Sequence, residues 1–354
     1  MEERKACASV LEKLSNWKNR AVEAYKRKAF SEWILLVLSS SGVLILAPAS
    51  SLICRVYNKN GGTSKWIISW ASVAGWPITA LMLLPLYLFF NPVPTPLTLQ
   101  LVLSYVGLGF LTTAHDLMFA YAYVYLPAPT ATLLASSSLV FSCLFGYFIV
   151  NNKLNASIIN ATVIITAATT IIALDSDSDS ERYDNVTDRQ YIWGFFWVCF
   201  ASLLHALIFA LSELVFIKLH GRRSFHVVLE QQAMVSFFAF LFTTIGVVVN
   251  KDFEGMKSEA KTFVGGEDAY VKLLVWAAIT FQLGTLGATG VVFLGSTVTA
   301  GIQNAVRDPI TSIAAVVFLN DPLTGLKILS LIITFWGFAC YIYGNPSSPK
   351  LSTT

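Results

Sequence analysis

Ten uninterrupted apolar stretches, each 20 to 28 residues long, dominate this chain. A helix needs about 20 apolar residues to cross a bilayer, whereas a strand of a membrane β-barrel needs about ten residues that alternate in polarity. The length of the stretches and their lack of alternation therefore predict membrane-spanning helices. We predict spans at residues 33–54, 66–90, 97–123, 127–149, 155–174, 191–218, 226–249, 271–295, 298–319 and 323–343.

The composition excludes most classes of soluble protein. The chain has 354 residues, of which 55% are hydrophobic and 13% charged, and its mean hydropathy is +0.63. Soluble domains carry about 25% charged residues, so this chain has too little polar surface for a soluble enzyme or a nucleic-acid-binding protein. The five cysteines form no CxxC pair, no histidines are spaced for zinc, and GxSxG and HExxH motifs are absent. We therefore predict no enzyme activity, no metal and no cofactor.

Polar segments divide the chain into two halves. A basic tail at 1–32 precedes the first five spans at 33–174, and an acidic loop at 175–190 separates them from the last five at 191–343. The chain ends in a short tail at 344–354, and a mixed-charge connector lies at 251–270. Thirteen Lys and Arg fall on the side of the N-terminus and ten on the other side, which predicts that both termini are cytoplasmic.

The two halves resemble one another when the chain is shifted by 168 residues. Leu126 then aligns with Leu294 and Asn152 with Asn320, and a short turn joins two spans in both places. Because five is an odd number, the second half must cross the membrane in the opposite direction. Such inverted repeats are typical of secondary carriers that work by alternating access around a site at the midplane.

Apart from three lysines near span ends, Lys218, Lys272 and Lys327, five charged residues fall inside the predicted spans, where charges are costly and usually mark a pathway. The side chain of Asp308 points about a quarter-turn away from Arg307, so we expect Arg307 to pair with Glu213, Glu230 or Asp116. A salt bridge that only joins helices is the alternative. His115 adjoins Asp116, and the two can exchange a proton or serve only as packing contacts. The predicted proton-coupling residues are Glu213, Glu230, Asp116, His205, Arg307 and Asp308.

Amide and aromatic side chains in the same spans suit a flat, neutral heterocycle. Rings can stack on the aromatic faces, while ring nitrogens accept and donate hydrogen bonds at the amides. A lipid-facing or interfacial position is the alternative for each aromatic residue. The predicted substrate-binding residues are Gln231, Gln282, Asp116, Tyr121, Tyr123, Trp276, Phe281, Gln303 and Asn304.

Several motifs, in this order, resemble those of the plant purine permeases, a branch of the drug/metabolite transporter superfamily. The longest is YAYVYLPAPTATLLASSSLVF at 121–141. The others are INATVIIT at 159–166, SEL at 212–214, EQQ at 230–232, FQLG at 281–284, LGATGVVFLGS at 286–296 and WGFACYIYG at 336–344. The chain departs from the family where it has His115-Asp116 for Asp-Asn, Ala210 for Pro, Phe281 for Trp and VRDP at 306–309.

The resemblance implies a fold and an activity. The fold is an all-α polytopic membrane protein with ten transmembrane helices in two inverted five-helix repeats. The activity is import of adenine-type purines or cytokinins by proton symport, at the plasma membrane or an endomembrane such as the ER or vacuole. The alternatives are a carrier of other N-heterocycles, such as alkaloids or vitamins, and a non-transporting receptor. We expect Glu213→Gln or Glu230→Gln to abolish gradient-driven accumulation, and Asp116 is the next candidate.

Overall fold

The chain folds into helices that follow the predicted apolar stretches. The computed structural model describes residues 30–90, 93–126, 131, 134–175, 186–221, 225–319 and 325–344, and every regular element within them is helical. The prediction of an all-α protein is therefore confirmed for these residues. Nearly all of the basic tail, most of the acidic loop and the C-terminal tail lie outside them. The helices are α2 (Phe30–Ser41), the π-helical turn η1 (Gly42–Leu46), α3 (Ala47–Lys59), α4 (Lys65–Val73), α5 (Trp76–Phe90), α6 (Leu99–Tyr125), α8 (Ser138–Phe148), α9 (Ala156–Asp175), α10 (Asp188–Lys218), α11 (His226–Val249), α12 (Asp252–Thr262), α13 (Gly266–Leu294), α14 (Thr297–Leu319) and α15 (Gly325–Gly344).

Helix length and polarity identify an integral membrane protein. Six helical stretches among the described residues are long and apolar enough to cross a bilayer. They are Ser31–Lys59, Lys65–Phe89, Leu99–Tyr125, Asp188–Lys218, His226–Val249 and Gly266–Leu294. Large apolar side chains also remain exposed on the outside of the bundle, for example Leu88 (74%) and Phe89 (79%), as expected for a surface that faces lipid. The count of ten spans stays a prediction.

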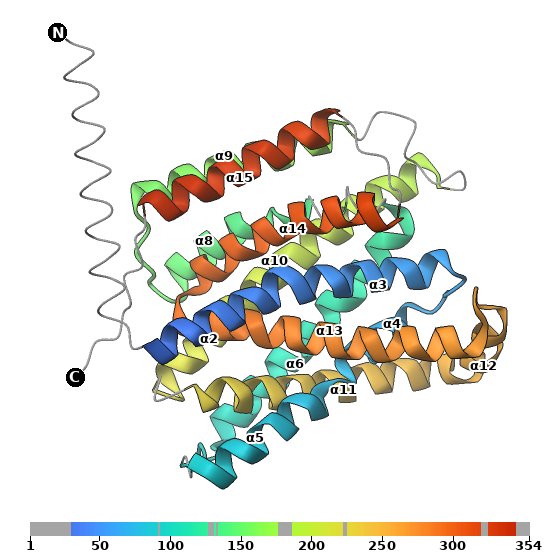
Figure 1. Cartoon of the computed structure of the whole chain (residues 1–354), viewed down its shortest axis with the longest axis horizontal. Coiled ribbons are helices and arrows are strands. Elements are labelled where there is room, and N and C mark those ends of the chain that lie inside the picture. The colour runs from blue at the N-terminus through green and yellow to red at the C-terminus, as the bar shows by residue number, and fades with distance from the viewer. Residues whose placement is uncertain are drawn as a thin grey trace.

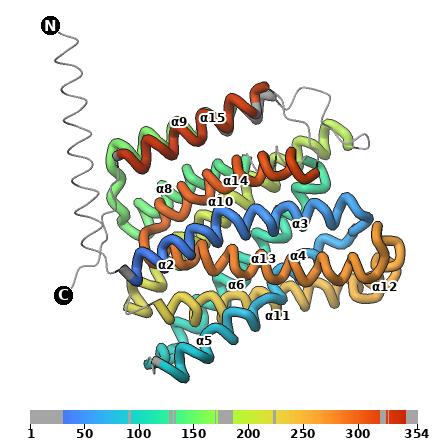
Figure 2. The backbone as a smooth tube through the Cα atoms, viewed as in Figure 1, coloured from blue at the N-terminus to red at the C-terminus, as the bar shows by residue number. Residues whose placement is uncertain are grey.

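The helices lie side by side in an elongated bundle. Figure 1 shows α9 and α15 along one edge, with α8 and α14 next to them, and α5 and α11 at the opposite edge. The tube view in Figure 2 shows the same order, with α13 and α6 between these groups. The stretches that the shift of 168 residues aligns, α8–α9 and α14–α15, are thus direct neighbours. Their inverted relationship stays a prediction.

Small residues let the first helical stretch lie very close to α13. A Cβ atom added at Gly42 would come within 3.0 Å of the carbonyl oxygen of Leu283, and one at Gly287 within 2.5 Å of that of Ser39. Gly42 opens the π-helical turn η1, which widens the helix here. Close approach through glycine is a common way to join helices in membranes. This contact places η1 and α13 together at one wall of the cavity in the bundle.

The mixed-charge connector at 251–270 is more ordered than a solvated loop. It contains α12, whose first turn carries Asp252 and Glu254 and whose last turn carries Lys261, as the helix dipole favours. Glu259 is buried and accepts hydrogen bonds from the hydroxyls of Tyr57, Thr63 and Tyr270. The connector therefore packs α12 onto the end of the bundle.

Candidate functional site

A cavity of about 170 Å³ lies between helices α3, α4, α6, α10, α11, α13 and α14. Phe119, Tyr123, Phe209 and Phe281 give it aromatic walls. Sites for drug-sized ligands have volumes of about 300–1,000 Å³, so this one favours a compact ligand. The predicted site residues that line it are Asp116, Tyr123, His205, Gln231, Phe281, Asn304 and Arg307.

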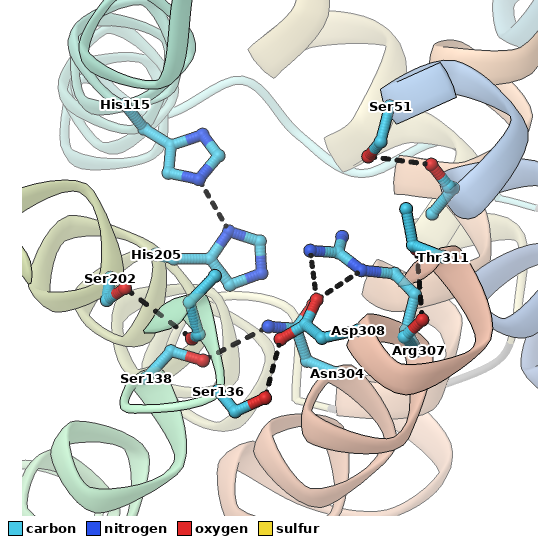
Figure 3. Close-up of polar contacts among 12 residues, drawn as sticks. Ser51, His115, Ser136, Ser138, Ser202, His205, Asn304, Arg307, Asp308 and Thr311 are labelled. Carbon is cyan, nitrogen blue, oxygen red and sulfur yellow. Dashed lines mark hydrogen bonds and ion pairs between the residues drawn. The ribbon is translucent and has the colours of Figure 1, made fainter. Parts of the chain in front are cut away.

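One wall of the cavity carries a row of titratable groups from two helices. On α6, His115 Nδ1 lies 2.9 Å from Asp116 Oδ1. On α10, His205 Nδ1 lies 3.0 Å from His115 Nε2, and the two imidazole rings are 4.7 Å apart. Figure 3 shows the two rings joined across the space between their helices. The structure thus joins Asp116, His115 and His205, which we name the α6–α10 row.

Arg307 pairs with its neighbour in sequence, which corrects our expectation. Its Nη2 and Nε atoms donate to Asp308 Oδ1 at 3.1 and 3.3 Å, while Ser136 Oγ donates to Asp308 Oδ2 at 3.0 Å (Figure 3). The prediction of Glu213, Glu230 or Asp116 as its partner was wrong. The Cβ atoms of adjacent helical residues do diverge, but the long Arg stem can bend back. The guanidinium therefore reaches the cavity wall with a carboxylate already bound.

Three buried polar atoms in the cavity wall have no hydrogen-bond partner among the described residues. They are Asp116 Oδ2, His205 Nε2 and Gln231 Oε1. A buried polar atom without a partner costs about 1–3 kcal/mol, so folded proteins rarely leave one unpaired without a reason. Their common position at one cavity is typical of groups that a ligand satisfies.

Glu213, on α10, is buried outside the cavity lining and lies next to the start of α14. Its Oε2 atom accepts a hydrogen bond from Asn152 Nδ2 at 2.8 Å and from the backbone N–H of Thr297 at 2.7 Å. Thr297 is the first residue of α14, where backbone N–H groups lack helical partners and the dipole favours an anion. Glu213 thereby fastens α10 to α14 and to the turn after α8.

Glu230 also lies outside the cavity lining, near the start of α11. It accepts hydrogen bonds from the hydroxyl of Tyr87 and from the backbone N–H and Oγ1 of Thr95, the latter two at 3.2 and 2.5 Å. His220 lies beside Thr95, with Nδ1 at 3.4 Å from Thr95 Oγ1. Its Nε2 atom lies 3.1 Å from the hydroxyl of Tyr105. The carboxylate joins α11 to the chain between α5 and α6.

Four predicted binding residues lie outside the cavity lining. Gln282 is fully buried and donates to Thr79 Oγ1 at 3.1 Å, while Gln303 donates to Ser40 Oγ at 3.0 Å. Tyr121 stacks on Trp197 with ring centres 5.7 Å apart, and Trp276 is 58% exposed. In the structure these side chains contact other helices or the surface. Asp308 reaches the cavity wall only through Arg307.

The prediction missed a second polar wall on α11 and α13. Gln232 Nε2 donates to Thr285 Oγ1 at 3.1 Å, and Thr289 Oγ1 donates to Gln232 Oε1 at 2.6 Å. All three residues line the cavity. Thr285 and Thr289 are four residues apart, the spacing of one helix face, and this was the available sequence signal.

Comparison with known proteins places this chain in a family of transporters. A family model described as purine nucleobase transmembrane transport matches residues 34–350. The chain belongs to the purine permease family. It is 64% identical to probable purine permease 5 of Arabidopsis thaliana over 335 residues, which cover 95% of this chain and 92% of that protein. It is 32% identical to purine permease 3 of the same plant, over 84% of this chain and 86% of that one.

A solved structure shares the fold of this permease. The two superpose with a TM-score of 0.58 over 87% of this chain and 97% of the other, at 11% sequence identity. At that identity the likeness concerns the fold alone. The family is one of transporters and not of enzymes, and its members carry purine nucleobases. The predicted family and the absence of an enzyme function are thus confirmed.

Proposed function

We propose that this permease imports adenine-type purines and cytokinins by proton symport with alternating access. The observation that carries the proposal is the cavity itself, where aromatic walls surround atoms of Asp116, His205 and Gln231 that have no partner in the part of the chain that the structure describes. A purine offers two flat faces for stacking, and its ring N–H and amino groups can donate hydrogen bonds to the oxygen atoms of Asp116 and Gln231. The small volume favours a free base over a nucleotide, and a cytokinin side chain requires the cavity to extend.

The proposal gives the cavity residues distinct roles. Tyr123 and Phe281 stack on the ring, and Gln231 and Asn304 orient its edge. Of the six predicted coupling residues, Asp116, His205 and Arg307 line the cavity, and Asp308 binds Arg307. Glu213 and Glu230 each accept hydrogen bonds from protein donors. We therefore place proton coupling at the cavity residues and not at Glu213 or Glu230.

The proposed transport cycle uses ten spans as two inverted halves, residues 33–174 and 191–343, that rock about the cavity. We place the permease in the plasma membrane with both termini in the cytoplasm. Epitope tags at each terminus, probed with antibody before and after permeabilisation of plant cells, test both statements. Labelling of intact cells would contradict the proposed orientation.

Uptake into liposomes tests the proposed activity. We expect the reconstituted full chain to accumulate radiolabelled adenine or trans-zeatin when the outside is more acidic than the inside. Trp276→Leu serves as a control, because that side chain lies outside the cavity and is exposed. Binding of the base without accumulation would indicate a receptor, and no uptake or binding of any N-heterocycle would contradict the proposal.

A further inference from the structure

The α6–α10 row is a continuous line of hydrogen-bonding atoms with one open end on each side. It runs from Asp116 Oδ1 to His115 Nδ1, from His115 Nε2 to His205 Nδ1, and ends at His205 Nε2. The separations of 2.9 and 3.0 Å are those of full hydrogen bonds. The other oxygen of Asp116 and Nε2 of His205 have no partner among the described residues.

The chemistry of the three groups fixes where the protons lie when Asp116 is ionised. A carboxylate can only accept, so His115 must carry its proton on Nδ1 and leaves Nε2 as an acceptor. His205 must then donate from Nδ1 to His115, and its own Nε2 is bare. In this state the row presents a hydrogen-bond acceptor to the cavity at His205.

We propose that this row is a reversible proton relay that stores the coupling proton as neutral Asp116. A proton that binds His205 Nε2 is balanced by transfer of the Nδ1 proton of His205 to His115 Nε2. His115 in turn passes its Nδ1 proton to Asp116 Oδ1. One proton enters, one O–H bond forms at Asp116, and each hydrogen bond is kept with its direction reversed.

The surroundings favour this neutral form over a charged imidazole. The ring of His115 lies 5.0 Å from that of Phe119, and the ring of His205 lies 4.5 Å from that of Phe209, so both imidazoles have apolar neighbours. Arg307 on α14 is the cation that acts on His205, with Asp308 bound to it. Cys54 on α3 and Tyr123 on α6 line the same cavity; Asp116 acts electrostatically on Cys54, and Arg307 and Asp308 act on Tyr123. A positive imidazole is repelled by Arg307, whereas two neutral imidazoles are not.

Protonation changes what the cavity offers to a ligand. Without the extra proton His205 Nε2 accepts a hydrogen bond, and with it the same atom donates one. An unprotonated ring nitrogen of a purine is an acceptor, so it pairs only with the proton-loaded state. Substrate and proton then increase each other's affinity, as linkage requires for symport. This step rests on the proposed function, whereas the relay rests on the geometry of its three side chains.

Histidine tautomers test the relay without any transport. The chain has four histidines, so ¹⁵N-histidine spectra of the purified permease can be assigned with single variants. We expect His115 and His205 to carry the proton on Nδ1 at alkaline pH, and to switch together to Nε2 on acidification while both stay neutral. Asp116→Asn should abolish the switch, since an amide cannot take up the proton. A charged imidazole at either position, or tautomers that never change, would overturn the relay.

Transport by matched variants tests the coupling. For one proton per substrate, a gradient of about one pH unit supports about a tenfold accumulation. We expect Asp116→Asn and His115→Phe to reduce this about tenfold, to an accumulation ratio near one, and to remove the pH dependence of the exchange of labelled for unlabelled adenine that is measured without a gradient. His226→Gln, a histidine at the start of α11 outside the cavity lining, should accumulate adenine like the wild type.

The outcomes separate the two proposals. Accumulation that keeps its full pH dependence in both relay variants would overturn the coupling role of the row. A tautomer switch in a wild-type protein that transports no base would support the relay and contradict the proposed function. Gradient-driven transport by a protein whose histidine tautomers never change would support the proposed function and overturn the relay.

Discussion

Glu213 and Asp116 are both carboxylates inside the bundle, but they differ in their hydrogen-bond partners. Glu213 accepts hydrogen bonds from Asn152 and from the first N–H of α14. Asp116 has one oxygen on His115 and the other without a partner among the described residues. A carboxylate whose partners are all protein donors holds helices together, whereas one with an open oxygen is available to a proton or a ligand. The contrast separates residues that build the fold from residues that act in it.

The largest expected effect follows from removal of Glu213. Glu213→Ala leaves the Thr297 N–H and the Asn152 amide without their acceptor, and each hydrogen bond to a charged group contributes about 1.5–3 kcal/mol. We expect the free energy of unfolding to fall by about 3 kcal/mol or more. Loss of monodisperse protein and a lower Tm in detergent are the measurements. A variant as stable as the wild type that fails only in accumulation would place Glu213 with Asp116 instead.

Removal of Glu230 should cost less, because that carboxylate is only half-buried. Glu230→Ala loses the contacts with Tyr87 and Thr95, and we expect a decrease of about 1–2 kcal/mol in the free energy of unfolding. Glu230→Gln keeps an acceptor and serves as the milder control. In contrast to the expectation from the sequence alone, both should still accumulate adenine at saturating concentration, because Glu230 contacts protein donors outside the cavity lining. Loss of pH dependence in Glu230→Gln would show that coupling extends beyond the cavity.

A substitution at Gln231 should change binding and leave stability intact. Its Oε1 atom is buried, lines the cavity and has no partner among the described residues. Gln231→Leu removes an unsatisfied group, so the Tm should be equal to that of the wild type or higher. We expect the KM for adenine to rise about tenfold, equivalent to about 1.4 kcal/mol of lost binding. An unchanged KM would remove Gln231 from the site.

The smallest effect on the KM for adenine is expected at Trp276, which the sequence analysis predicted to bind substrate. Because the side chain is 58% exposed on α13, Trp276→Leu should alter the KM for adenine by less than about twofold. Phe281→Leu, on the same helix but in the cavity lining, is the matched comparison and should raise the KM more. Equal effects of the two substitutions would show that the cavity does not bind the ring.

Helix positions were predictable because they depend on local apolar length. The predicted span at 226–249 coincides with α11, and that at 298–319 begins one residue after α14 does. The rotation of each helix was not predictable in the same way. Helices that are apolar on nearly all sides give little signal about which face points inward. Gln282 and Gln303 therefore looked equivalent to Gln231, yet they bond to Thr79 and Ser40 outside the cavity lining.

The sequence by itself determined a helical membrane protein, its family and the short set of charges that the bilayer must accommodate. These follow from composition, from the lengths of apolar stretches and from motifs along the chain. Only the tertiary structure decided which charges meet, because partners come from distant helices: His115 and His205 are 90 residues apart. It also decided that Glu213 and Glu230 bind protein donors, while Asp116 and His205 each keep an atom without a partner among the described residues. Whether a buried polar group is structural or functional depends on its surroundings, and the packing of the helices fixes those surroundings.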